Sequence, residues 1–267
     1  MKNLRAALKF VAFAILSAII VPSQTLVLAL HKGKASYILP RLWLAGTTKI
    51  FGISYQITGT PSRAPQTLYM SNHLSYLDIP LLGGLIKNSS FLAKKEVATW
   101  PVFGFLSKLQ QTAYIERKGT AIKKEAQKLQ ERVDKKQNLV IFPEGTSTDG
   151  IKVRNFKSSL FTLAIGQIDH PDLYIQPITL KLLTTDKKQP QTLDERRLYT
   201  WPVEDLIELP EHLWRFARCR GAALQLIFHD TIKASDWDDR KALAKACQNS
   251  VSNGLENNFD QHSKEDT

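Results

Sequence analysis

The clearest structural signal in this chain is residues 138–147, Asn138-Leu139-Val140-Ile141-Phe142-Pro143-Glu144-Gly145-Thr146-Ser147. A short apolar run bounded by turn-forming residues predicts a buried strand that ends at Phe142. The turn that follows presents a carboxylate, a glycine and a hydroxyl at the end of this strand. Ligand pockets in α/β proteins often lie in such loops. Glu144, Gly145 and Thr146 are therefore candidate substrate-binding residues.

The segments around this strand alternate between strand and helix patterns, which is typical of an α/β domain, here assigned to residues 52–257. Strands are predicted at residues 53–58, 67–71, 90–93, 112–115, 138–142, 175–182 and 223–228. Helices are predicted at residues 78–85, 100–109, 120–135, 159–168 and 237–257. Residues 258–267 are polar and are predicted to form a disordered tail.

The N-terminal region favours a membrane. Residues 10–30 contain no charged side chain over 21 positions, and about 20 apolar residues suffice to cross a bilayer. A cleaved signal peptide is the less favoured alternative, because the run exceeds the usual apolar core of about 7–15 residues. Pro22 leaves a kinked or re-entrant helix open beside a spanning one. Residues 37–51 have the composition of a helix at the head-group level, so we assign residues 1–51 to N-terminal membrane-anchoring helices.

Charge and cysteine content limit the classes of partner. The 36 Lys and Arg exceed the 25 Asp and Glu, which gives a formal net charge of +11 and favours anionic surroundings. Charge alone does not choose between lipid head groups, nucleic acid and phosphorylated ligands. Cys219 and Cys247 are far apart and show no disulfide or zinc spacing, so no metal is implied and a reducing, cytoplasmic setting is favoured.

A second polar cluster lies in residues 72–78, Asn72-His73-Leu74-Ser75-Tyr76-Leu77-Asp78. An imidazole that accepts and returns a proton near neutral pH suits general-base catalysis, and a nearby carboxylate can fix its tautomer. Taken alone, Asp78 could equally be a carboxylate stabilised at the start of a helix. The Phe142-Pro143-Glu144-Gly145 turn downstream favours the catalytic interpretation.

Together the two clusters resemble motifs I and III of the glycerolipid acyltransferases, the family of 1-acyl-sn-glycerol-3-phosphate (lysophosphatidic acid) acyltransferases. The likeness extends over roughly residues 37–230. It implies a mixed α/β sheet flanked by helices, behind an N-terminal membrane-anchoring helical segment. It also implies that His73 is the general base and that Asp78 orients its imidazole.

The resemblance implies roles for other residues. Arg117 corresponds to the motif II arginine that holds an acceptor phosphate, for which a guanidinium fork is well suited. Glu144, Gly145 and Thr146 correspond to the substrate-binding turn of motif III, where Glu144 would accept from a glycerol hydroxyl or brace Arg117. Pro177 falls where motif IV would lie, with an acyl-contacting or purely structural role.

The implied reaction is acyl transfer from acyl-CoA or acyl carrier protein to the hydroxyl of a lysolipid. No cofactor is expected beyond that co-substrate, and no nucleic acid partner. The implied location is the bacterial inner (cytoplasmic) membrane, with the catalytic domain on its cytoplasmic face. Lysophosphatidic acid is the favoured acceptor because Arg117 and the Glu144 turn are both present. The pair Ser158-Ser159 resembles members that include lyso-ornithine lipid acyltransferases, which keeps that acceptor as the alternative.

Two other classes explain part of the pattern. A membrane-anchored hydrolase would share the imidazole and carboxylate but needs a nucleophile, and no Gly-x-Ser-x-Gly elbow occurs in the chain. A non-enzymatic basic protein of a membrane surface or nucleic acid would account for the net charge and the anchor. It would not account for the two motifs.

Overall fold

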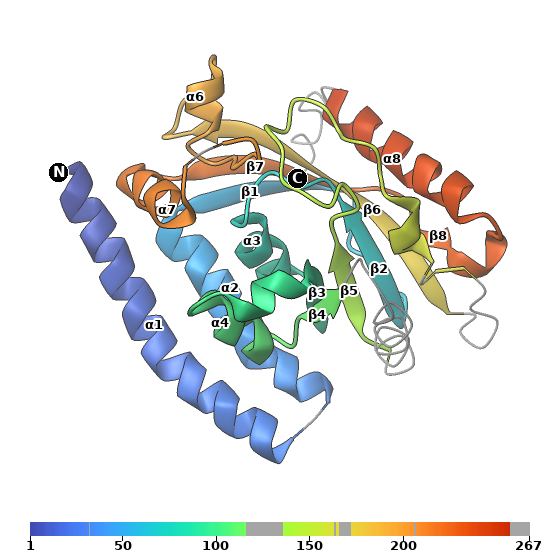
Figure 1. The fold of residues 1–267 in the computed structure, drawn as a ribbon, viewed down its shortest axis with the longest axis horizontal. Helices are drawn as coiled ribbons and strands as arrows, with labels where there is room; N and C mark the ends of the chain where they lie inside the picture. The colour runs from blue at the N-terminus through green and yellow to red at the C-terminus, as the bar shows by residue number, and fades with distance from the viewer. Residues whose placement is uncertain (32, 116–135, 163, 166–171, 206, 257–267) are drawn as a thin grey trace, which may run out of the picture.

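A computed structural model describes residues 1–31, 33–115, 136–162, 164–165, 172–205 and 207–256. Within these residues one sheet of eight strands runs through the molecule, with helices on both of its faces (Figure 1). The strands lie in the order β1-β7-β6-β2-β5-β3-β4, and β8 pairs with β6. The strands are β1 (Ile53–Thr58), β2 (Gln66–Ser71), β3 (Ser89–Lys94), β4 (Ala113–Ile115), β5 (Asn138–Ile141), β6 (Leu173–Thr185), β7 (Ala222–Phe228) and β8 (Ile232–Lys233).

The sheet is mixed, as the resemblance implied. Strands β2 and β5 are parallel neighbours at its centre, with Met70 opposite Ile141, whereas β6 pairs antiparallel with β7 and β8. Every residue of β2 is buried, as expected for a strand covered on both faces. Because parallel strands end at the same edge of a sheet, the segments that follow β2 and β5 meet there. These two segments carry His73 and Glu144.

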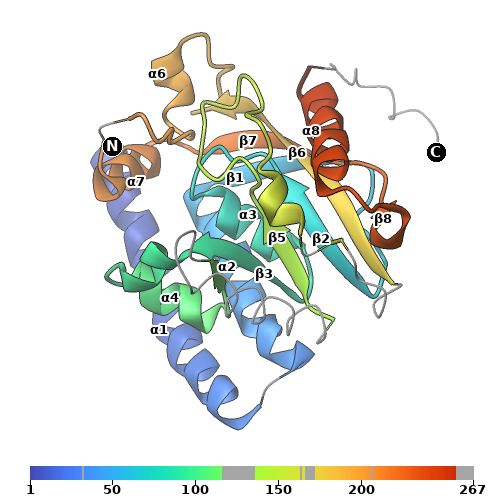
Figure 2. The same cartoon turned by 45° about the vertical axis from the view of Figure 1, so that its right-hand side comes forward.

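Three helices form the layer on one face, α1 (Lys2–Leu30), α2 (Ile38–Phe51) and α3 (Asp78–Leu85), while α8 (Arg240–Glu256) packs on the other face against β6 (Figures 1 and 2). The remaining helices are α4 (Phe103–Leu109), α6 (Leu193–Arg196) and α7 (Leu209–Arg218). Short 3-10 helices occupy η1 (Lys34–Tyr37), η2 (Lys95–Thr99), η3 (Ser158–Phe161) and η4 (Ala234–Asp236). Figure 2 shows α2 and α3 stacked beneath the sheet, with α1 outside them.

Helix α1 is long and apolar enough to cross a membrane. It continues through Pro22 without a break in the helix assignment, although proline removes one backbone donor. The hydroxyls of Ser23 and Thr25 donate to the carbonyls one turn earlier, those of Ile19 and Val21. These bonds satisfy polar groups that the apolar surroundings would otherwise leave unpaired.

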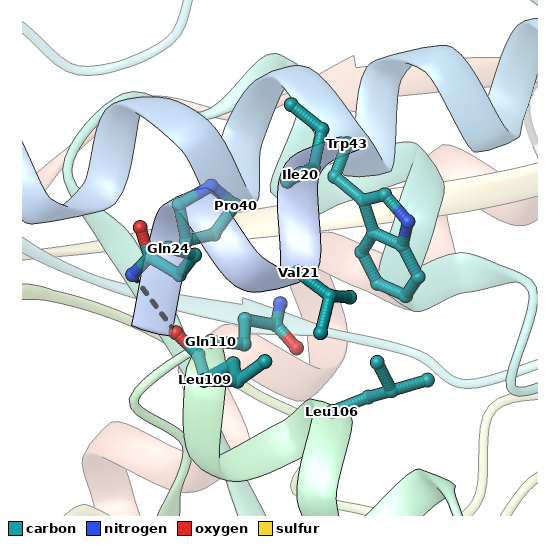
Figure 3. Close-up of a pocket in the computed structure, with 8 residues that line it drawn as sticks. All are labelled: Ile20, Val21, Gln24, Pro40, Trp43, Leu106, Leu109 and Gln110. Carbon is teal, nitrogen blue, oxygen red and sulfur yellow. Dashed lines mark hydrogen bonds between the residues drawn. The ribbon is translucent and has the colours of Figure 1, made fainter. Parts of the chain in front are cut away.

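Both ends of α1 are fixed to the rest of the protein. Near its start, Lys9 Nζ donates to the carbonyl of Phe51 at the end of α2 (2.8 Å) and to that of Cys219 just after α7 (2.9 Å). Near its other end, Gln24 Nε2 donates to the carbonyls of Ser36 (2.9 Å) and Leu109 (3.1 Å). Gln24 lies in a small pocket between α1, α2 and α4 (Figure 3). The anchor candidate is therefore an integral layer of the fold.

Several predicted elements differ from the structure. The expected helix at residues 159–168 is only the 3-10 turn η3 where it is described, and the expected helix at residues 120–135 lies outside the described residues. Helix α7 was not predicted, although its buried residues Leu209, His212 and Phe216 recur at helical spacing. The very short elements α6 and β8 carry too few residues to show a period.

Candidate active site

The segment after β2 forms a histidine–aspartate pair at the start of α3. His73 Nδ1 lies 2.8 Å from Asp78 Oδ2. The same oxygen accepts from the backbone N–H groups of Leu74 (2.7 Å) and Ser75 (3.0 Å). Because this carboxylate oxygen is an acceptor, we assign the ring proton to Nδ1. His73 Nε2 is then left as the atom that can accept a proton from a substrate.

The other oxygen of Asp78 is held by a residue far along the chain. Tyr199 donates its hydroxyl to Asp78 Oδ1 over 2.9 Å, and both residues are fully buried. Burial and the charge of Asp78 raise the pKa of the Tyr199 phenol well above its usual value, so it stays a donor. Sequence reasoning missed Tyr199, because residues 196–201 match no motif and only the fold brings them to the pair.

The ring of His73 is fixed by the loop that follows β5. It stacks on Phe142 with ring centroids 3.9 Å apart and planes 15° from parallel. The backbone N–H of His73 donates to Glu144 Oε1 (2.9 Å), and its carbonyl accepts from the N–H of Thr148 (2.9 Å). The His73 side chain remains 17% exposed, so the imidazole is held in place and is still accessible from solvent.

Glu144 is buried and holds backbone groups on two loops. Its Oε2 accepts from the N–H of Arg154 (3.0 Å), while its Oε1 accepts from His73. Burial raises the pKa of Glu144 to about 7, against the lowering effect of these two N–H groups and of the Arg154 charge. In this arrangement Glu144 supports the position of His73, and a bond from Glu144 to a substrate hydroxyl or to Arg117 stays a prediction.

The turn that carries Glu144 explains why the next residue, Gly145, is a glycine. The N–H of Gly145 donates to the carbonyl of Phe142 (2.9 Å), which closes a β-turn with Pro143 at its second position. Gly145 has a φ of 73°, which a glycine adopts without steric cost. Thr146, the next predicted residue, is partly exposed beside this turn.

The remaining predicted residues are not brought into this cluster. Arg117 lies outside the described residues. Pro177 is buried inside β6, opposite Met70 of β2, so it is not at a strand edge. Asn72, which had no assigned role, joins the end of β2 to β6 through two hydrogen bonds with the backbone of Leu180 (2.9 and 2.7 Å).

A second histidine, His212, holds the segment that carries Tyr199. His212 Nε2 faces the carbonyls of Arg197 (2.9 Å) and Thr200 (3.1 Å), so this nitrogen carries the proton. Its Nδ1 then accepts from the hydroxyl of Tyr76 (2.9 Å). Burial lowers the pKa of His212, which favours this neutral form. These bonds fix the segment that presents Tyr199 to the histidine–aspartate pair.

The described residues contain no group of three or more His, Cys, Asp or Glu side chains that could hold a metal ion. Cys219 and Cys247 are buried thiols, and burial raises the pKa of both, that of Cys247 to about 12. A thiol in this state is a poor nucleophile. The arrangement that the described residues do provide is an imidazole with an orienting carboxylate, which suits general-base chemistry.

Known proteins share this fold and sequence pattern. A family model described as Acyltransferase matches residues 54–181. The lyso-ornithine lipid O-acyltransferase of Brucella abortus is 30% identical over 254 residues, covering 93% of both chains. The 1-acyl-sn-glycerol-3-phosphate acyltransferase of Neisseria gonorrhoeae is 27% identical over 192 residues, covering 72% of this chain and 70% of that protein.

The fold itself has a solved counterpart. The crystal structure of the 1-acyl-sn-glycerophosphate acyltransferase of Thermotoga maritima superposes with a TM-score of 0.62 at 17% identity, over 95% of this chain and 96% of that one. With the fold, the histidine–aspartate pair and these matches, the chain belongs to the glycerolipid acyltransferase family. It is an acyltransferase of lipid biosynthesis.

Proposed function

We propose that this enzyme transfers an acyl chain to the hydroxyl of a lyso-ornithine lipid. The observation that carries the proposal is the match to the Brucella abortus enzyme of that name, which spans 93% of both chains. The sequence had favoured lysophosphatidic acid on the strength of Arg117 and the Glu144 turn. Both carboxylate oxygens of Glu144 accept from backbone N–H groups, which weakens the second of these two arguments.

The proposed reaction uses His73 as its base. Nε2 removes the proton of the acceptor hydroxyl while Asp78 stabilises the positive charge that develops on the ring. The hydroxyl oxygen attacks the thioester carbonyl of acyl-CoA or acyl carrier protein, and the carbon–sulfur bond breaks. The departing thiolate takes the proton back from the imidazolium. Transfer is direct and requires no acyl-enzyme.

Lysophosphatidic acid is the second candidate acceptor. It is favoured by the Neisseria gonorrhoeae relative and by the resemblance of Arg117 to the motif II arginine. The two acceptors differ in chemistry, since one carries a phosphate monoester and the other a carboxylate and an ammonium group. Arg117 would face a carboxylate or have a structural role if the ornithine lipid is the substrate.

We propose that the enzyme lies on the cytoplasmic face of the bacterial inner membrane. Support comes from α1, whose apolar length suffices to cross or enter a bilayer. Lys2, Arg5 and Lys9 lie at the start of this helix, close to α7 of the catalytic domain. Lys34 and Arg41 also follow the helix, so the basic residues at its two ends nearly balance and do not orient it by themselves.

Acceptor and donor can be tested together. The purified full-length protein is mixed with labelled acyl-CoA or labelled acyl carrier protein, and with lyso-ornithine lipid or lysophosphatidic acid. We expect the labelled diacyl product chiefly from the ornithine lipid, with His73→Ala as the inactive control. Exclusive use of lysophosphatidic acid would overturn the main proposal in favour of the second candidate. Release of free fatty acid without an acceptor would indicate a hydrolase.

A further inference from the structure

Residues 100–105, which comprise the loop between η2 and α4 and the first turn of α4, expose large apolar side chains. The exposed fractions are 41% for Trp100, 68% for Val102, 39% for Phe103 and 52% for Phe105. An exposed apolar patch of this kind usually marks a contact with a partner or a membrane. None of these residues belongs to the histidine–aspartate site described above.

The loop is held in a strained conformation that points it outward. The N–H of Phe103 donates to the carbonyl of Pro101 (2.6 Å), and Val102 between them has φ 61° and ψ −59°. This is a classic γ-turn, a rare and strained form that is unusual for a β-branched residue. Such strain persists where the surroundings fix it and often accompanies function.

Gly104, which follows this turn, is packed closely against η2. A Cβ atom on Gly104 would come within 2.5 Å of the carbonyl oxygen of Ala98. Only glycine therefore allows α4 to begin this close to η2. Fixed by this contact on one side and by Pro101 on the other, the turn keeps Val102 at the tip of the loop.

The loop lies beside the anchor candidate. Helices α1 and α4 are neighbours in both views, and Gln24 of α1 bonds to the carbonyl of Leu109 at the end of α4 (Figures 1 and 2). Along α1, exposed apolar side chains recur at helical spacing. They are Leu4, Leu8, Val11, Ile15, Ile19, Leu26 and Leu30. The exposed apolar surface of α1 thus has a close neighbour in the Trp100–Phe105 loop.

The chemistry around the loop suits a bilayer surface. Lys94 and Lys108 are exposed on either side of its aromatic residues. Aromatic and basic side chains together are typical of segments at the level of lipid head groups. We propose that residues 100–105 insert into the bilayer next to α1 and form a second attachment point for the enzyme. This inference rests on the proposed membrane location.

The test places an environment-sensitive fluorophore on single cysteines in the full-length protein. The native thiols are buried, so added exposed cysteines are labelled selectively. Val102→Cys probes the loop, Ile19→Cys probes α1, and Leu193→Cys in α6 is an exposed control far from α4 in Figure 1. The proteins are bound to anionic phospholipid vesicles that contain nitroxide-labelled acyl chains.

We expect the labels at positions 102 and 19 to shift their emission to shorter wavelength and to be quenched, and the label at position 193 to do neither. Quenching at position 19 alone would overturn the loop insertion and leave the α1 anchor standing. Quenching at neither position would overturn the membrane location as well. Equal quenching at positions 102 and 193 would also overturn the inference, because the contact would not be specific to the loop.

A second variant measures how much the loop contributes to membrane binding. Phe105→Ser should weaken vesicle binding by roughly tenfold or more, because one aromatic side chain no longer enters the apolar phase. The matched control Leu193→Ser should leave vesicle binding unchanged. Turnover of a detergent-dispersed lysolipid should be unaffected by both changes. Unchanged vesicle affinity of Phe105→Ser would contradict the insertion.

Discussion

Replacing Tyr199 with phenylalanine should change how the catalytic pair responds to pH. The change removes one oxygen atom and keeps the ring that packs edge-on against Phe216, with centroids 5.8 Å apart. It leaves Asp78 Oδ1 without its phenolic donor inside a fully buried site. Oδ2 keeps its bonds to His73 and to two backbone N–H groups.

The magnitude follows from the type of bond that is lost. A hydrogen bond to a charged group contributes about 1.5–3 kcal/mol. The Tyr199 bond stabilises ionised Asp78, the form of the carboxylate that orients His73 to accept a substrate proton. Because Asp78 is ionised whether His73 is neutral or protonated, only part of this energy changes the pH dependence, so the acid-side midpoint of activity should rise by less than about 1 pH unit. Glu144 and Tyr76, the other titratable groups near this network, are left in place.

The assay is kcat/KM with the preferred acceptor, measured across the neutral and acidic range for both proteins. Tyr69→Phe is the matched control, because it also removes a buried phenol hydroxyl, one that bonds to Thr67 and not to the catalytic pair. A loss of activity by the same factor at every pH would show that Tyr199 acts only on folding. An unchanged profile would refute the role assigned to its hydroxyl.

Three further predictions concern the site. His73→Ala should lower kcat by about 10²–10⁴-fold with little change in thermal unfolding, and Asp78→Asn should lower it less; near-normal kcat at saturating substrate would exclude His73 as the base. Glu144 has a pKa of about 7 in the fold against 4.5 for a free carboxyl. Because Glu144 takes up a proton on folding in this range, the free energy of unfolding should fall by about 3 kcal/mol as the pH rises from about 4.5 to 7. Glu144→Gln should flatten this pH dependence, measured by urea unfolding. Arg117→Lys should raise KM for lysophosphatidic acid more than for lyso-ornithine lipid, since a lysine cannot reproduce a bidentate phosphate contact; equal effects on both acceptors would contradict a phosphate-specific role.

The sequence predicted those parts of the site that are local or follow a strand. His73 and Asp78 are close in the chain, so their pairing needed only a short turn and a helix start. Glu144 was predicted to lie in a ligand-binding turn after a strand, but its bond to the backbone of His73 depends on β2 and β5 being parallel neighbours. That adjacency is a property of the folded sheet and has no local signal.

Long-range contacts were beyond sequence reasoning. Tyr199 is separated from Asp78 by 121 positions, and its environment is set by α7 and His212, neither of which was predicted. The strands fared better than the helices, because alternation of apolar and polar residues marks β1 and a short apolar run marks β5. Helix α7 is amphipathic, so its period is present in the sequence, but it spans only 10 residues between loops.

The hydrogen bonds of Lys9 matter for the preparation of a detergent-free enzyme by removal of its N-terminal helix. Two helices, α2 and α7, end at carbonyls that receive the Lys9 ammonium, and Phe10 stacks on Trp214 with centroids 5.8 Å apart. A chain that started after Leu30 would leave these carbonyls uncapped and open an aromatic surface to water. Helix α1 thus acts as a structural brace as well as a candidate membrane anchor, and solubilisation with an intact N-terminus is the safer route to active protein.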